Sequence, residues 1–174
     1  MVSCSDSDNW KVETHSVSTT PFVQPVGPAH ILSPSLLEIF KLFMTSALVA
    51  MIVEQSNLYA RQVLGDAADT WEDITENDIW AMFGFCILMG INKLPALHQY
   101  WSHNPVYHYR PVAERITRDR FFAIMRFLHF VDNTTLASRT DPEYDQLGKV
   151  RPVISSVDTA YLANYCPHRE QSID

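Results

Sequence analysis

Five arginines crowd into one short stretch in the second half of the chain. The seventeen residues from Arg110 to Arg126 contain only two acids, Glu114 and Asp119. Guanidinium groups at this density can bind the phosphates of a nucleic-acid backbone, and nearby tyrosines can stack or donate hydrogen bonds. The alternative is a solvated helix face with intrahelical ion pairs, and composition alone favours that alternative. The candidate DNA-binding residues are Arg110, Arg115, Arg118, Arg120 and Arg126.

Histidines are the next candidates for chemistry. His98, His103 and His108 follow one another at intervals of five residues. Side chains share a helix face when they are three or four residues apart, so this spacing does not gather them on one face. We therefore expect ordinary packed or surface histidines here and no metal site.

The three cysteines, Cys4, Cys86 and Cys166, are far apart and form no Cys-x-x-Cys pair. They indicate a reduced intracellular compartment. Cys86 lies inside an apolar run and is expected to be inert packing. The sequence also lacks a Gly-x-Ser-x-Gly motif and a glycine-rich phosphate loop, so it offers no sign of a hydrolase.

Charge is divided unevenly along the chain. The 174 residues carry a formal net charge of -7, which argues against a histone-like coat on nucleic acid. Residues 1–80 hold three Lys or Arg against eleven Asp or Glu, whereas residues 81–174 hold ten against nine. No secretory signal is visible at the start. The apolar stretches 42–53 and 79–91 are well short of the ~20 apolar residues that a membrane span needs. We therefore expect that the chain does not associate with a membrane.

The elements that must position these residues are mainly helices. Residues 1–30 contain Pro, Ser and Thr without an apolar period, which predicts a flexible leader. Apolar spacing then predicts helices over 35–64, 75–91, 117–131 and from near Arg151 to 165, with a lone strand in the closing REQSID.

Three details of these helices can be checked. Ser35 and Glu38 predict a capping box at the first helix, and Thr75 with Asp78 at the second. The second helix is apolar on nearly all sides, as expected at the centre of a bundle. In the third, Arg118, Asp119 and Arg126 are expected to face water, and a different face is expected to hold Phe122, Met125 and His129.

Five longer blocks of the sequence follow one another between about Ile31 and Asp174. They read NLYARQ, WEDITENDIWAMFGFCILMGINKLPALHQYWS, ITRDRFFAIMRFLHFVDN, DPEYDQLGKVRPVI and REQSID. In their order and spacing these blocks resemble the piggyBac family of transposases and transposable element-derived proteins.

The resemblance implies a fold and a reaction. Active members of the family are cut-and-paste DNA transposases with an RNase H-like core, in which three aspartates hold two divalent ions, Mg²⁺ or Mn²⁺, for phosphoryl transfer. The first of these aspartates follows Ser-Ile in a strand, which matches Asp174 here. Asp174 is thus both the catalytic and the metal-ligand candidate, in a site whose other carboxylates have no counterpart in these residues.

The resemblance also implies an organisation and partners. We expect a flexible leader at 1–30, a helical dimerisation and DNA-binding type of domain at 31–168, and the first strand of a truncated RNase H-like core at 169–174. DNA and a second copy of the chain are the implied partners, in the nucleus, with weak DNA binding. We expect no bound cofactor, no small-molecule substrate and no enzymatic activity of this chain alone.

Three readings remain open at this point. The chain is a truncated, inactive protein that keeps DNA binding or dimerisation, an incomplete gene model of an active transposase, or a helical interaction module without DNA binding.

Overall fold

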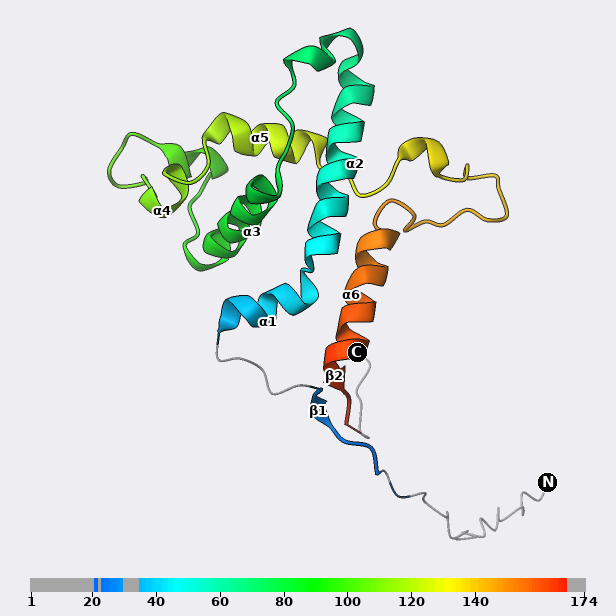
Figure 1. Ribbon diagram of the computed structural model, residues 1–174. Helices are drawn as coiled ribbons and strands as arrows, with labels where there is room; N and C mark the ends of the chain where they lie inside the picture. Colours follow the sequence, from blue (N-terminus) through cyan, green and yellow to red (C-terminus); the bar gives the residue numbers. More distant parts are fainter. Residues whose placement is uncertain (1–20, 22, 30–34, 169–174) are drawn as a thin grey trace, which may run out of the picture.

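The computed structural model describes residue 21 and residues 23–29 and 35–168 (Figure 1). This part of the chain is mainly helical, as the apolar periodicity predicts.

The first long apolar run forms two helices and not the single helix expected over 35–64. Helix α1 covers Leu36–Phe43 and α2 covers Ser46–Leu64, and the chain bends by 59° between Leu36–Phe43 and Ser46–Thr70. The break occurs because Thr45 adopts an extended backbone and its hydroxyl accepts a hydrogen bond from the Leu48 N–H at 3.2 Å, which starts a new helix. Ser35 is the N-cap of α1, but its side chain makes no capping bond, so the predicted capping box there is wrong.

Helix α3, Glu76–Ile91, begins with the predicted capping box. The Asp78 N–H donates to the Thr75 hydroxyl at 3.2 Å, and the Thr75 N–H donates to the Asp78 carboxylate at 2.9 Å. Helix α3 is apolar on nearly all sides, but the expectation that it lies at the centre of a bundle is wrong for its last turns, because Ile87 is 51% exposed and Ile91 is 76% exposed. Cys86 is exposed as well, so it is not packed in the core.

The remaining elements are short except for two helices. Helix α5, Arg118–Phe127, ends before the predicted limit at 131, whereas α6, Arg151–Asn164, begins where predicted, with Pro152 in its first turn. The short elements are the 3-10 helices η1 Gly65–Thr70, η2 Leu97–Trp101 and η3 Asn133–Thr135, and helix α4 Arg110–Ala113.

The core lies where α2, α3 and α5 meet (Figure 1). Phe85 is at its centre, with its ring edge-on to those of Tyr100 and Phe121 at centroid distances of 5.1 and 4.5 Å. Buried Asn57 ties α2 to the segment before α3. Its amide oxygen accepts from the Ile74 N–H at 2.8 Å and from the Trp71 indole at 3.1 Å. The core therefore fixes α3 and α5 relative to each other.

A two-residue antiparallel ladder joins the two ends of the described chain. Strand β1, Gly27–Pro28, pairs with β2, Tyr165–Cys166, directly after α6. The Ala29 N–H extends the ladder by donating to the Asn164 carbonyl at 2.9 Å. Part of the predicted leader is thus paired with the end of the helical domain. The predicted strand in REQSID lies outside the described residues.

Within the described ranges, no single helix has the length and apolar character needed to cross a membrane. The bent pair of Leu36–Phe43 with Ser46–Thr70 meets that test only when the two pieces are taken together.

Candidate nucleic-acid interface

Helix α5 presents an outer face with an arginine near each end. The Thr117 hydroxyl caps the helix by accepting from the Arg120 N–H at 3.2 Å. The inner face is buried and consists of Phe121, Ile124 and Phe127. Positions three or four residues apart, or seven or eight, lie on one side of a helix. The outer face therefore holds Arg118, Phe122, Met125 and Arg126, all of them exposed.

The predicted division of this helix between core and solvent is partly wrong. Arg118 and Arg126 face solvent as expected, but Phe122 is 42% and Met125 is 47% exposed on the same side. His129 lies beyond the end of α5, where its ring stacks on Tyr59 at 3.9 Å. Apolar residues at adjacent positions give two possible helical stripes, and the sequence does not say which one meets the core.

Two of the candidate arginines, Arg110 and Arg118, form exposed ion pairs with the two acids of this stretch. Arg110 pairs with Glu114 one turn along the chain. Arg118 pairs with Asp119 at 2.8 Å. Exposed pairs of this kind contribute roughly 0–1 kcal/mol each. Either guanidinium can therefore exchange its carboxylate partner for a phosphate at little cost.

Arg120 is held inside the fold. Its guanidinium donates to the Asp78 carboxylate at 2.7 Å and to the carbonyls of Glu72 and Asp73, both at 2.8 Å. It also lies 5.8 Å from the centre of the Trp71 ring, and its side chain is only 17% exposed. Arg120 therefore fastens α5 to the start of α3, and few of its donors remain for a phosphate.

Arg115 and Arg126 lie beside apolar side chains. The Arg126 guanidinium lies 5.0 Å from the centre of the Phe127 ring. Arg115 borders an apolar pocket of about 340 Å³ together with Pro111 and Ile116. In the part of the chain that the structure describes, neither forms an ion pair with an acid. They are therefore the candidates with the least internal competition for a phosphate.

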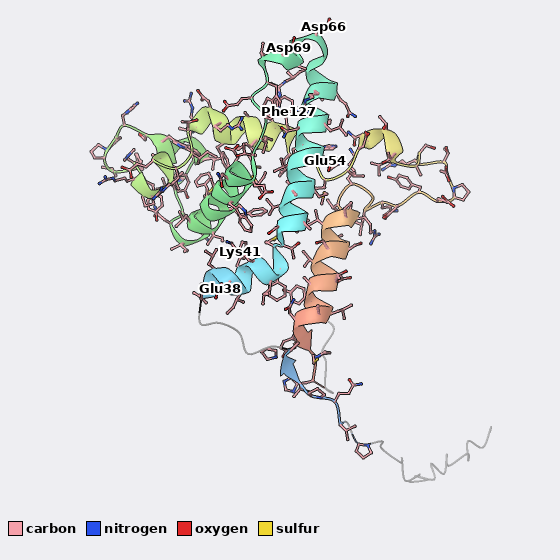
Figure 2. The ribbon with its side chains drawn as sticks, viewed as in Figure 1. Glu38, Lys41, Glu54, Asp66, Asp69 and Phe127 are labelled. Atoms are coloured by element: carbon pink, nitrogen blue, oxygen red, sulfur yellow. The ribbon has the colours of Figure 1, made fainter. Side chains whose placement is uncertain are left out.

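The acids of the first half that the structure describes lie on α1, α2, the turn after α2, the segment that leads into α3 and the first turn of α3, where Asp78 pairs with Arg120 of α5. Figure 2 shows Asp66 and Asp69 at the turn that follows α2, Glu54 on α2 itself and Glu38 on α1. These four carboxylates do not form one patch beside α4.

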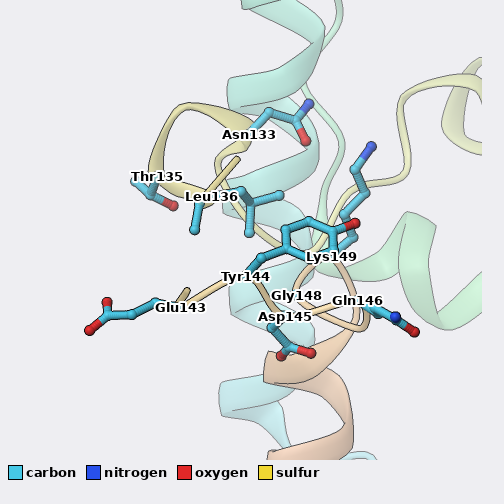
Figure 3. A pocket seen from close by; sticks show the side chains of 10 residues that line it. Asn133, Thr135, Leu136, Glu143, Tyr144, Asp145, Gln146, Gly148 and Lys149 are labelled. Atoms are coloured by element: carbon cyan, nitrogen blue, oxygen red, sulfur yellow. The ribbon is translucent and has the colours of Figure 1, made fainter. Parts of the chain in front are cut away.

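A polar pocket that the sequence did not suggest lies between η3 and the loop before α6 (Figure 3). Its volume is about 690 Å³. Arg151 fixes one wall by donating two hydrogen bonds to Asp145, at 2.7 and 2.8 Å. These bonds from Arg151, with one from the Leu147 N–H, lower the pKa of Asp145 to about 2. The lining residues are Asn133, Thr135, Leu136, Ala137, Glu143, Tyr144, Asp145, Gln146, Gly148 and Lys149.

Asp174, the predicted catalytic and metal-binding residue, lies outside the described residues. Among the described residues there is no group of three or more His, Cys, Asp or Glu side chains able to hold a metal ion. A pair of divalent ions requires several carboxylate ligands. The described residues therefore do not fit such a pair, and no catalytic step can be derived from them.

Comparison with known proteins places the chain in a family. The sequence profile of the family described as Transposase IS4 matches residues 35–174. Human PiggyBac transposable element-derived protein 2 is 33% identical to this chain over 116 residues. Human PiggyBac transposable element-derived protein 3 is 31% identical over 121 residues. These matches cover 67% and 70% of this chain but only 18% and 19% of those proteins.

A solved structure shares the fold. The structure of a piggyBac transposase synaptic complex with hairpin DNA is similar with a TM-score of 0.63 and 24% sequence identity. The similarity covers 83% of this chain and 30% of the chain in that complex. Because the family profile matches most of the sequence and the described helices share this fold, the chain belongs to the piggyBac-type transposase family.

Proposed function

We propose that this chain binds the backbone of double-stranded DNA through the outer surface of α4 and α5, and that on its own it does not cut or join strands. The observation that carries the proposal is the set of four exposed arginines on α4, on α5 and between them, of which two form only exposed ion pairs and two form none with a described acid. The four are Arg110, Arg115, Arg118 and Arg126.

The family relationship supports DNA as the partner. The solved neighbour is a complex of a transposase with hairpin DNA, and its protein shares the fold of this chain. The exposed rings and thioether on the outer face, such as Phe122 and Met125, offer apolar contacts to sugars between the phosphates. We also propose a nuclear location, since duplex DNA is the partner.

Binding should not depend on base sequence. Contacts from arginine to phosphate position a protein on DNA but carry no sequence information. We expect two unrelated duplexes of equal length to bind with equal affinity. The dissociation constant should be ~1 μM or weaker, because so few phosphates are contacted. Fluorescence anisotropy with both duplexes measures this. A preference of one duplex by tenfold or more would contradict backbone binding, and no binding to either would favour an interaction module without DNA.

Strand cleavage is not expected from this chain alone. Of the three carboxylates implied by the family resemblance, the 174 residues contain a match only for Asp174. Two-metal phosphoryl transfer needs all of them to hold its ions. Incubation of labelled duplex with the chain and Mg²⁺ or Mn²⁺ should give no nicked or joined product above a buffer control. Product that disappears in an Asp174→Ala variant would refute this expectation.

A further inference from the structure

A second pocket lies between the η2 segment and the start of α5, beside the proposed DNA surface. Its volume is about 460 Å³, and two histidines and an arginine contribute to its wall. The lining residues are Trp101, His103, His108, Ala113, Thr117, Arg118 and Asp119. The sequence spacing that kept the histidines off a common helix face did not reveal this arrangement, because a turn and not a helix brings His103 and His108 to the same pocket.

The hydrogen bond of His108 fixes which ring nitrogen carries a proton. Its Nδ1 lies 2.9 Å from the Ser102 carbonyl oxygen. A carbonyl only accepts, so Nδ1 is the donor in this bond. The other nitrogen, Nε2, is therefore an acceptor when His108 is neutral and a donor when it is protonated. Protonation thus turns this ring from one that repels an anion's oxygens into one that binds them.

The remaining charges at the pocket nearly cancel. Arg118 and Asp119, both from α5, pair with each other at 2.8 Å. Helix α4 contributes Ala113 and η2 contributes Trp101, neither of which is charged. The formal charge of the lining is therefore about zero when both histidines are neutral. It rises by two when both are protonated.

We propose that this pocket binds one phosphate group of the DNA backbone and that it does so when His103 and His108 are protonated. Arg118 gives up Asp119 for the phosphate, and the two imidazolium rings donate to the phosphate oxygens. The Thr117 hydroxyl, which accepts from the Arg120 N–H, can donate its own proton to the same group. The chain's affinity for DNA then increases as the solution becomes more acidic. This inference rests on the proposed DNA binding and adds a pH-dependent contact to it.

The sign of the pH effect follows from linkage. An anion beside an imidazole favours the charged form of the ring, so binding takes up protons. Affinity is then highest at low pH and falls as the pH rises through the region where the histidines lose their protons. Each proton taken up changes affinity by up to roughly tenfold per pH unit above that region.

The experiment measures DNA affinity of the full chain by anisotropy at constant salt between about pH 5.5 and pH 8. We expect the wild-type affinity to fall by roughly tenfold or more between the lowest and the highest pH of this series. A His103→Gln, His108→Gln variant should lose most of that fall. The matched control is His98→Gln, since His98 is also exposed and lies outside the pocket. Its pH profile should equal that of the wild type.

One further variant and one further measurement complete the test. Asp119→Asn removes the carboxylate that competes with phosphate, so it should raise affinity at every pH. An unchanged pH profile in the double histidine variant would overturn the pocket while leaving DNA binding by the arginines intact. If no DNA binds at any pH, the proposed function fails, and inorganic phosphate then tests the pocket alone. Its addition at low pH should shift the side-chain ¹⁵N resonances of His108 but not those of His98, and no shift would overturn the pocket too.

Discussion

Replacing Arg120 with alanine is expected to lower the free energy of unfolding by about 1–3 kcal/mol, because the change leaves a partly buried carboxylate without its partner. Asp78 is 21% exposed and accepts two hydrogen bonds from Arg120, at 2.7 and 3.3 Å. The carbonyls of Glu72 and Asp73 lose their donors in the same step. Urea unfolding followed by circular dichroism measures the loss.

The same contact predicts how this loss depends on pH. Burial raises the pKa of Asp78, but hydrogen bonds from Arg120 and Thr75 outweigh it and hold the pKa below its ordinary value of 3.8. A carboxyl group with a lowered folded-state pKa stabilises the protein above its unfolded-state pKa, and that contribution disappears as the pH falls through the folded-state value. The gap between wild type and Arg120→Ala should therefore be constant above about pH 5 and should narrow below pH 3.8.

Arg118 supplies the matched control, since it lies two residues away on the same helix. Its ion pair with Asp119 is exposed, with side chains 58% and 83% accessible. Arg118→Ala should change the free energy of unfolding by less than about 0.5 kcal/mol. Equal losses in the two variants would show that Arg120 is not a structural contact.

The difference between these arginines shows what the sequence could and could not reveal. The local pattern of Thr117 and the residues after it predicts a helix and places five cations near it, and the structure has that helix. The partner of Arg120, however, is Asp78, which lies 42 residues earlier in the chain. A contact at that separation depends on how α3 and α5 pack, and a local reading of charge does not contain that information.

The buried face of α5 and the break between α1 and α2 could not be predicted from the sequence for a related reason. Residues 121–127 contain apolar side chains at adjacent positions, so two stripes fit the helical period equally well. The break between α1 and α2 depends on Thr45 acting as a cap inside a run that is apolar on both sides. By contrast, the capping box of Thr75 with Asp78 could be predicted from the sequence, because it is a local signal that needs no tertiary partner.

The second large effect concerns DNA. An Arg115→Gln, Arg126→Gln variant is expected to bind duplex DNA about tenfold or more weakly than the wild type near neutral pH. Both guanidinium groups are exposed and form no ion pair with a described acid, so their loss should leave the fold intact. Circular dichroism and the unfolding midpoint verify that the variant is folded.

A control for net charge is available in the segment between η3 and α6. Arg139→Gln, Lys149→Gln removes the same two positive charges from exposed positions away from α4 and α5. If only the overall charge of the chain matters, this variant should weaken binding as much as the first one. If the surface of α4 and α5 binds DNA, it should weaken binding by less than about threefold.

The salt dependence of DNA affinity tests the location of the interface most directly. Each phosphate neutralised contributes about -0.9 to the slope of log K against log salt. With four arginines at the surface, the wild-type slope near pH ~7.5 should be about -3 to -4. The slope for Arg115→Gln, Arg126→Gln should be about -2, while that for Arg139→Gln, Lys149→Gln should match the wild type. Equal slopes in the wild type and the Arg115→Gln, Arg126→Gln variant would contradict an interface on α4 and α5.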